Sequence, residues 1–171
     1  DVKTDLIFAP DAAELYPEGF STAISMGGPA LGLESETCPH VFGGGAIVVA
    51  KLLIAVRPDI AVFGEKDYQQ LLVVRRLARD LGLAAAIVGA PIRREADGLA
   101  MSSRNVYLDP AQRRVAGTMN RILHEAVTSL REGRAVAEVE AAAAAALRTE
   151  GFDAVDYVAV RDAEDLRPVS D

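Results

Sequence analysis

The chain has 171 residues and half of them are hydrophobic, which is enough for one ordinary domain, or two small ones, with a sizeable core. A formal net charge of −7 argues against nucleic-acid binding that depends on a basic surface, and no apolar run approaches the ~20 residues needed to span a membrane. The single cysteine, Cys38, excludes an internal disulfide framework and fits a reducing, cytoplasmic location.

The chain begins with a strand-like run and without Met, so we expect a fragment of a longer protein. Residues 5–10 predict a strand that ends at proline, and the alternating residues 20–26 predict a half-buried strand. We expect a loop over residues 30–42 and an apolar helix over residues 46–56. With an apolar strand at residues 59–62, strand 20–26 and this helix predict a right-handed βαβ unit in a parallel sheet.

A glycine cluster at residues 43–45 precedes the predicted helix. Glycine-rich helix starts can bind phosphate, but this cluster lacks the Lys-Ser/Thr of a P-loop and the spacing of a dinucleotide-binding motif. A flexible entry to a buried helix is the favoured interpretation.

Residues 63–70, Phe-Gly-Glu-Lys-Asp-Tyr-Gln-Gln, connect the apolar strand to a predicted helix over residues 71–81. Ligands collect at the carboxyl ends of strands in open α/β sheets, and Lys66 adds a cation where helix N–H groups already favour an anion. The structural alternative is equally strong, because Asp67 with Gln70 resembles a capping box and a solvated lysine needs no ligand. The predicted helix over residues 71–81 has one apolar face, formed by Leu71, Val74, Ala78 and Leu81.

A second polar stretch follows a predicted buried strand at residues 84–89. Residues 94–105, Arg-Glu-Ala-Asp-Gly-Leu-Ala-Met-Ser-Ser-Arg-Asn, place two hydroxyls and a guanidinium beside backbone N–H groups, which is a suitable set for phosphate. The alternative is an inter-domain linker in which the arginine forms a salt bridge.

The rest of the chain predicts two helices and a strand. The first helix begins at residues 109–112 with a cap, an N1 proline and a capping-box glutamine, and it ends at Gly133. An alanine-rich helix over residues 136–148 and a strand over residues 154–160 follow. His124 has no Cys, Asp or Glu partner at ligand spacing except Glu125 beside it, so we interpret it as a surface or boundary histidine.

The two polar stretches, residues 63–70 and 94–105, make the chain resemble the pantoate–β-alanine ligase (pantothenate synthetase) family over nearly its whole length. The resemblance implies an α/β fold: a Rossmann-like nucleotidylyltransferase parallel sheet, incomplete here, followed by a small α+β C-terminal domain. Residues 1–92 would be the C-terminal part of the ATP- and pantoate-binding domain, and residues 93–171 an incomplete C-terminal lid domain.

The resemblance also implies an activity, the ATP-dependent condensation of pantoate with β-alanine through a pantoyl-adenylate, with release of AMP and pyrophosphate. Mg²⁺ would accompany ATP, with ligands that the sequence leaves unknown, and the enzyme would be a homodimer. By motif position, Gly64 and Asp67 would hold the ATP ribose, Lys66 would neutralise phosphate charge in catalysis, and Gln70 would hydrogen-bond pantoate.

The remaining nucleotide-binding positions come from the second stretch. The backbone of Met101 would meet the adenine, beside Arg93, where the family often has valine. Ser102, Ser103 and Arg104 would bind phosphates and act in catalysis from a mobile loop that corresponds to the KMSKS loop of aminoacyl-tRNA synthetases.

Besides Arg93, the chain departs from the family pattern in two places. The family's His-x-Gly-His stretch and the glutamine that shares pantoate with Gln70 are absent, so we expect about the first third and the C-terminal end of a family member to be missing, and the fragment alone to be inactive. Residues 38–45 read Cys-Pro-His-Val-Phe-Gly-Gly-Gly where the family has Arg-Pro-x-His-Phe-x-Gly-Val, so the histidine sits one position early and cysteine replaces arginine.

Two alternatives stay open at this point. One is another adenylate-forming nucleotidylyltransferase, since the Gln69-Gln70 pair favours a small hydroxy acid only weakly. The other is a non-enzymatic structural or dimerising remnant.

Overall fold

The structure, a computed structural model, describes residues 3–169. Strands β1 (Ile60–Gly64) and β2 (Ala86–Ala90) form a parallel pair, and helix α4 (Tyr68–Asp80) connects them. Ile60 lies opposite Ala86 in this register and Gly64 lies opposite Ala90. The strand–helix–strand unit confirms the α/β class and both strands that were expected here.

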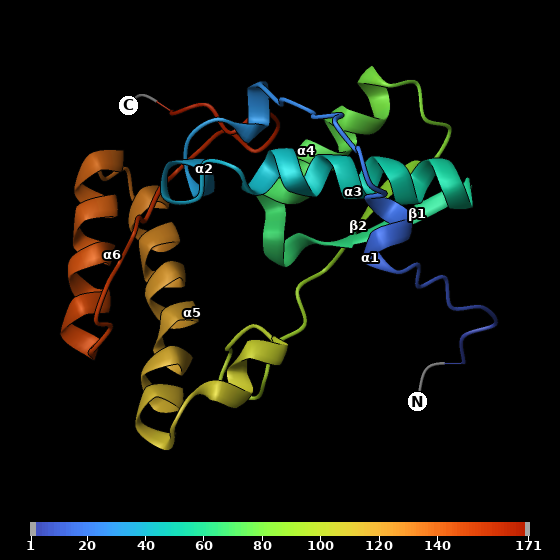
Figure 1. Ribbon diagram of the computed structural model, residues 1–171. Coiled ribbons are helices and arrows are strands. Elements are labelled where there is room, and N and C mark those ends of the chain that lie inside the picture. The colour runs from blue at the N-terminus through green and yellow to red at the C-terminus, as the bar shows by residue number, and fades with distance from the viewer. Residues whose placement is uncertain (1–2, 170–171) are drawn as a thin grey trace.

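The other helices precede and follow this unit. Helices α1 (Ala12–Leu15), α2 (Glu34–Thr37) and α3 (Val41–Val56) precede it, and α5 (Pro110–Arg131) and α6 (Val136–Glu150) follow it. Short 3₁₀ turns lie at η1 (Gly28–Ala30), η2 (Glu65–Asp67) and η3 (Ser103–Tyr107). Figure 1 shows α5 and α6 side by side, set apart from α3, α4 and the strands. No helix within residues 3–169 has the length and apolar character to cross a membrane.

The core of the first part lies between α3 and α4. Leu77 of α4 packs against Ala46 and Ala50 of α3, and Val73 packs in a second cluster with Phe42. Helix α3 therefore packs against α4, and α4 in turn packs against the two strands.

The predicted apolar face of α4 is confirmed at three positions and wrong at one. Leu71, Val74 and Ala78 are buried. Leu81 is 52% exposed, because α4 ends at Asp80 and the next residue leaves the helical face.

The segment at residues 20–26 is extended but pairs with no strand in the described part of the chain, so the predicted strand and the βαβ unit through it are wrong. Ile24 and Met26 instead pack against the α3–α4 cluster. A Cβ on Gly43 would lie 3.1 Å from the Ile24 carbonyl oxygen, so the segment rests directly on α3. Alternation indicates which side chains face a core, and it does not determine whether the backbone finds a partner strand.

The strands predicted at residues 5–10 and 154–160 are also wrong, since both segments are irregular. Leu6 and Ile7 are about four-fifths exposed, at 82% and 80%, with no neighbouring strand among residues 3–169 to cover them. Residues 154–160 run along α5 and α6, where Val155 packs against the cluster around Ile122. Apolar extended segments can thus pack on helices without joining a sheet.

Helix α3 begins five residues before the predicted start, at Val41, so the glycine cluster lies inside its first turns and is not a flexible entry. The expected loop over residues 30–42 contains α2 and the first two residues of α3. Burial of Phe42 against Val73 explains the early start, because packing outweighs the poor helix propensity of glycine.

The ends of α5 and α6 confirm the sequence prediction. The Asp109 carboxylate accepts hydrogen bonds from the N–H groups of Ala111 and Gln112, at 2.7 and 2.8 Å, and the Gln112 side chain accepts from the Asp109 N–H at 3.0 Å. Gly151 follows α6 with φ 108°, a left-handed conformation that glycine adopts without strain. His124 is exposed on α5, as predicted.

Candidate active site

The turn after β1 presents a charged pair to solvent. Gly64 ends the strand, η2 follows, and a Cβ on Gly64 would meet nothing within 4 Å, so the strand end is open to a ligand. The Lys66 ammonium lies 3.2 Å from the Asp67 carboxylate, and both side chains are largely exposed. Asp67 makes no capping hydrogen bond to α4, so the capping-box interpretation of Asp67 with Gln70 is wrong.

A cavity of about 350 Å³ opens beside this turn, and we call it the Lys66 pocket. Lys66 and Asp67 enter it from η2, Gln70 enters it from the first turn of α4, and Glu34 enters it from α2. It therefore combines a cation, carboxylates and an amide over the carboxyl end of β1. The complete lining is Leu33, Glu34, Val41, Phe42, Lys66, Asp67, Tyr68, Gln69, Gln70, Tyr157 and Leu166.

A second, smaller cavity of about 130 Å³ shares Gln70 with the Lys66 pocket. Its other walls are apolar and belong to α3 and α4, so the Gln70 amide is its polar group. We call it the Gln70 pocket, and its lining residues are Val41, Phe42, Gly45, Ala46, Val49, Gln70, Val73 and Val74. Among the described residues the Gln70 side chain has no hydrogen-bond partner, which leaves its donor and acceptor available to a ligand.

Gln69 has a different role from Gln70. Its amide donates to the carbonyls of Pro29 and Gly32, at 3.0 and 3.1 Å, and its oxygen accepts from the Glu34 N–H at 3.2 Å. Gln69 therefore holds the backbone before α2 in place, and of this pair only the Gln70 amide has no hydrogen-bond partner among the described residues.

The second predicted group of site residues lies elsewhere. Arg93, Met101, Ser102, Ser103 and Arg104 line neither of these two cavities. In Figure 1 the segment with η3 lies next to the start of α5, away from α2 and α3. The Ser102 hydroxyl accepts the Arg104 N–H at 3.2 Å and so caps η3. Arg104 forms no ion pair with any residue from 3 to 169; the salt bridge of this stretch instead joins Asp97 to Arg113 of α5.

The sequence did not predict the contribution of the C-terminal segment to the Lys66 pocket. Tyr157 and Leu166 form part of its wall, and the Tyr68 hydroxyl ties this segment to α4 by donating to the Ala163 carbonyl at 2.9 Å. Burial, together with the nearby carboxylates of Glu34 and Asp156, raises the pKa of Tyr157. Its phenol is therefore protonated at neutral pH and can donate a hydrogen bond. Only the fold brings these distant positions together, so spacing offered no signal.

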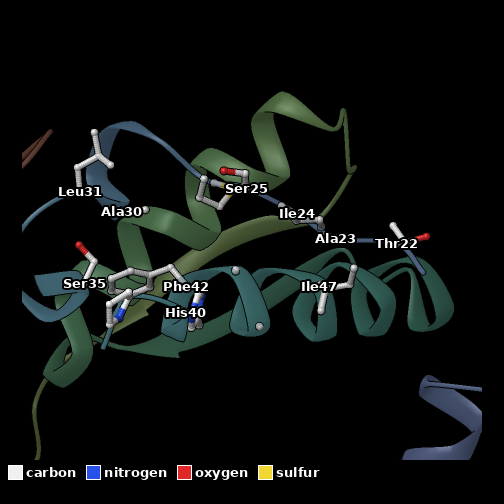
Figure 2. A pocket seen from close by; sticks show the side chains of 14 residues that line it. Thr22, Ala23, Ile24, Ser25, Ala30, Leu31, Ser35, His40, Phe42 and Ile47 are labelled. Carbon is white, nitrogen blue, oxygen red and sulfur yellow. The ribbon is translucent and has the colours of Figure 1, made fainter. Parts of the chain in front are cut away.

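A cavity of about 570 Å³, larger than these two, lies between the extended residues 22–26 and α3 and contains neither Lys66 nor Gln70. Figure 2 shows the extended residues Thr22, Ala23 and Ile24 above Ile47 of α3, with Ser35, His40 and Phe42 toward the other end. His40 therefore faces a different cavity from the predicted site residues, which is consistent with its displaced position in the family pattern.

No three His, Cys, Asp or Glu side chains within residues 3–169 gather in a way that could hold a metal ion. Mg²⁺ commonly binds ATP through phosphate oxygens with only one or two protein carboxylates. The residues described here thus form no protein-built magnesium cage.

A parallel strand–helix–strand unit with a basic turn and a pocket at the carboxyl end of its first strand is the arrangement of α/β nucleotide-binding proteins. The family model for pantoate-β-alanine ligase matches residues 1–171, and the chain belongs to that family. The predicted resemblance is thereby confirmed.

Curated relatives support this membership. Pantothenate synthetase from Rhodopseudomonas palustris (strain HaA2) is 54% identical over 166 residues, which cover 96% of this chain and 58% of the relative. The enzyme from Mesorhizobium japonicum is 53% identical, with 98% and 59% covered. The chain thus spans less than two thirds of the length of these relatives.

Solved structures confirm the fold. Pantothenate synthetase from Thermus thermophilus superposes with a TM-score of 0.91 at 48% identity, covering 99% of this chain and 62% of the other. Pantoate-β-alanine ligase from Francisella tularensis, complexed with beta-gamma ATP and β-alanine, gives a TM-score of 0.69 at 28% identity, with 81% and 50% covered.

Proposed function

We propose that the protein containing this chain condenses pantoate with β-alanine to pantothenate, uses ATP through a pantoyl-adenylate, and releases AMP and pyrophosphate. The observation that carries the proposal is the position of Gln70, which lines both the charged Lys66 pocket and the small apolar Gln70 pocket. Family membership and the ATP and β-alanine named for the Francisella tularensis relative support it.

The proposed chemistry begins with a carboxylate, which is a poor electrophile at neutral pH. One pantoate oxygen attacks the α-phosphorus of ATP, pyrophosphate leaves, and a mixed anhydride forms. The amine of β-alanine then attacks the activated carbonyl carbon, AMP leaves, and the nitrogen loses a proton. The phosphorus-centred transition state gains negative charge, so a cation fixed beside it stabilises it. Lys66 supplies that cation in the proposal, and no side-chain nucleophile is needed.

The two adjoining pockets suit two parts of the substrates. Pantoate is a small hydroxy acid with a branched apolar centre, which matches the apolar walls of the Gln70 pocket. The Gln70 amide would bind its hydroxyl and carboxylate, and would direct the carboxylate toward Lys66 in the neighbouring pocket. Gly64 and Asp67 would hold the ATP ribose at the open end of β1.

The second group of residues completes the proposed nucleotide site. Arg93 and Met101 would border the adenine, and Ser102, Ser103 and Arg104 would bind phosphates. Because these residues lie outside the Lys66 pocket, the segment that carries them must approach it when ATP binds. We accordingly propose a domain boundary near Ile92, between residues 1–92 and a lid of residues 93–171, in a cytoplasmic homodimer.

The products test the adenylate mechanism. We expect the complete protein, supplied with ATP, pantoate and β-alanine, to release AMP and pyrophosphate in equal amounts with pantothenate. Chromatographic separation of the nucleotides measures this directly, with omission of pantoate as the control. Stoichiometric ADP in place of AMP would contradict the mechanism.

Gln70→Ala tests the substrate pocket. We expect weaker pantoate binding and nearly unchanged ATP binding, because the amide faces the apolar pocket and makes no hydrogen bond within residues 3–169 that folding depends on. Calorimetric titration with each ligand measures the two effects separately. Gln69→Ala is the matched control, and it should disturb the backbone before α2 instead. Equal losses for both ligands in Gln70→Ala would argue against a pantoate contact.

Residues 1–171 expressed alone should bind nucleotide weakly and show no measurable turnover. The proposed site is divided between two separate regions, and Ile60 and Val62 of β1 are 61% and 63% exposed, which favours association through the strand. Partial sites bind weakly because fewer contacts offset the entropy of immobilising a ligand. The measurement is a turnover assay with all substrates, next to size-exclusion chromatography. A rate on the order of 1 s⁻¹ would show the prediction to be wrong.

A further inference from the structure

The segment that carries the proposed phosphate-binding residues begins with a tight hairpin at residues 94–100. Arg94 pairs with Ala100 in an antiparallel bridge, and the Glu95 N–H donates to the Leu99 carbonyl at 2.8 Å. Gly98 turns the hairpin with φ +89°. The Asp97 carboxylate accepts the Leu99 N–H at 3.2 Å, so the hairpin tip holds Asp97 in one orientation.

Asp97 binds Arg113 of α5 through both carboxylate oxygens. One oxygen accepts from a terminal guanidinium nitrogen at 3.1 Å, and the other accepts from the second terminal nitrogen. The Arg113 hydrogen bond, with a smaller contribution from the Leu99 N–H, holds the pKa of Asp97 below its ordinary value. The carboxylate is therefore ionised at neutral pH, and a two-point arginine pair fixes direction as well as distance.

Two glycines mark direct contact between the hairpin and α5. Gly117 lies one helical turn after Arg113, and a Cβ there would come within 2.7 Å of an Asp97 carboxylate oxygen. A Cβ on Gly98 would come within 2.8 Å of the Asn120 side-chain nitrogen. Glycine is less favourable than alanine inside a helix. The close approach of Asp97 explains the glycine at position 117, because a side chain there would collide with the carboxylate.

The anchored hairpin continues directly into the proposed phosphate-binding residues. The Met101 N–H donates to the Arg93 carbonyl at 2.8 Å, and the Asn105 amide donates to the Ala100 carbonyl at 3.1 Å. Residues 101–105 are therefore held to the same hairpin at both ends.

We propose that Asp97 and Arg113, which meet beside Gly117, are positioning residues. They set the orientation of Ser102, Ser103 and Arg104 toward the nucleotide phosphates. The inference rests on the proposed function for the identity of the ligand. It adds that α5 and the 94–105 segment approach ATP as one unit, with Asp97 as the attachment point.

Gly117→Ala separates positioning from stability. Alanine improves the helix and displaces Asp97, so the melting temperature should stay equal or rise while kcat/KM for ATP falls by ~10-fold to 100-fold. Asp97→Asn should lower kcat/KM for ATP in the same way. Thr128→Ala is the matched control, because it also improves α5 but lies on an exposed part of the helix where its hydroxyl bonds only to the His124 carbonyl.

Hydrogen exchange of the complete protein, measured by mass spectrometry on peptides from residues 94–108, gives a readout independent of activity. Faster exchange is expected in Gly117→Ala and Asp97→Asn and unchanged exchange in Thr128→Ala. If the pair acts as a unit, the double variant Asp97→Asn with Arg113→Gln should lower kcat/KM for ATP no further than the more damaging single variant does. Unchanged exchange, or faster exchange with full kcat/KM for ATP, would overturn the inference. Absence of ATP binding in the unsubstituted protein would instead overturn the proposed function, and exchange would still decide the anchoring.

Discussion

Lys66→Ala is expected to slow adenylate formation by ~10²–10³-fold, equivalent to ~2.7–4 kcal/mol of transition-state stabilisation, while folding changes little. The ammonium lines the Lys66 pocket at the carboxyl end of β1, where the proposed α-phosphate gains charge. Its partner within the described residues is Asp67, and both side chains are largely exposed, at 44% and 62%. Exposed salt bridges contribute only ~0–1 kcal/mol to stability. The substitution should therefore reduce the rate of adenylate formation and leave the free energy of unfolding nearly unchanged.

Single-turnover formation of the adenylate, followed with labelled ATP in the absence of β-alanine, measures this effect, and thermal unfolding measures stability in parallel. Lys51→Ala is the control that removes the same charge elsewhere. Its ammonium lies 4.8 Å from the ring centre of Phe20 and lines neither the Lys66 pocket nor the Gln70 pocket. Adenylate formation at the unsubstituted rate in Lys66→Ala would remove Lys66 from the active site.

Local signals in the sequence predicted the parts of the fold that local interactions determine. Asp109 was identified as a helix cap because Pro110 and Gln112 complete the motif, and the structure contains all of its hydrogen bonds. Asp67 has a similar glutamine three residues later, but it is the last residue of η2 and pairs with Lys66 instead. The difference lies in the preceding backbone, which a capping pattern does not describe.

Long-range pairing was the part that sequence patterns did not predict. Residues 20–26 and 154–160 have the alternation of strands, and their apolar side chains do face cores, but each backbone runs over helices. The candidate site shows the same limit. The Phe63–Gln70 stretch identified Lys66 and Gln70, whereas Tyr157 reaches their pocket only through the packing of the C-terminal segment.

Leu77→Ala is expected to lower the free energy of unfolding by ~2–5 kcal/mol, the cost of removing a buried leucine and leaving a cavity. Leu77 is 2% exposed and packs against Ala46 and Ala50, whose small side chains cannot move in to fill the space. Leu81, four residues later, was predicted to lie on the apolar face of the helix but is 52% exposed beyond the end of α4. Leu81→Ala should therefore change stability by no more than ~0.5 kcal/mol.

Urea denaturation of the two variants, followed by circular dichroism, measures the difference through the shift in midpoint at constant slope. Leu77 lines neither the Lys66 pocket nor the Gln70 pocket, so ligand affinity should persist in Leu77→Ala wherever it remains folded. Both substitutions remove the same side-chain atoms, one inside α4 and one just past its end. A difference in stability between them therefore reports the difference in burial. Equal destabilisation by the two substitutions would mean that α4 continues past Asp80 and buries Leu81 against α3.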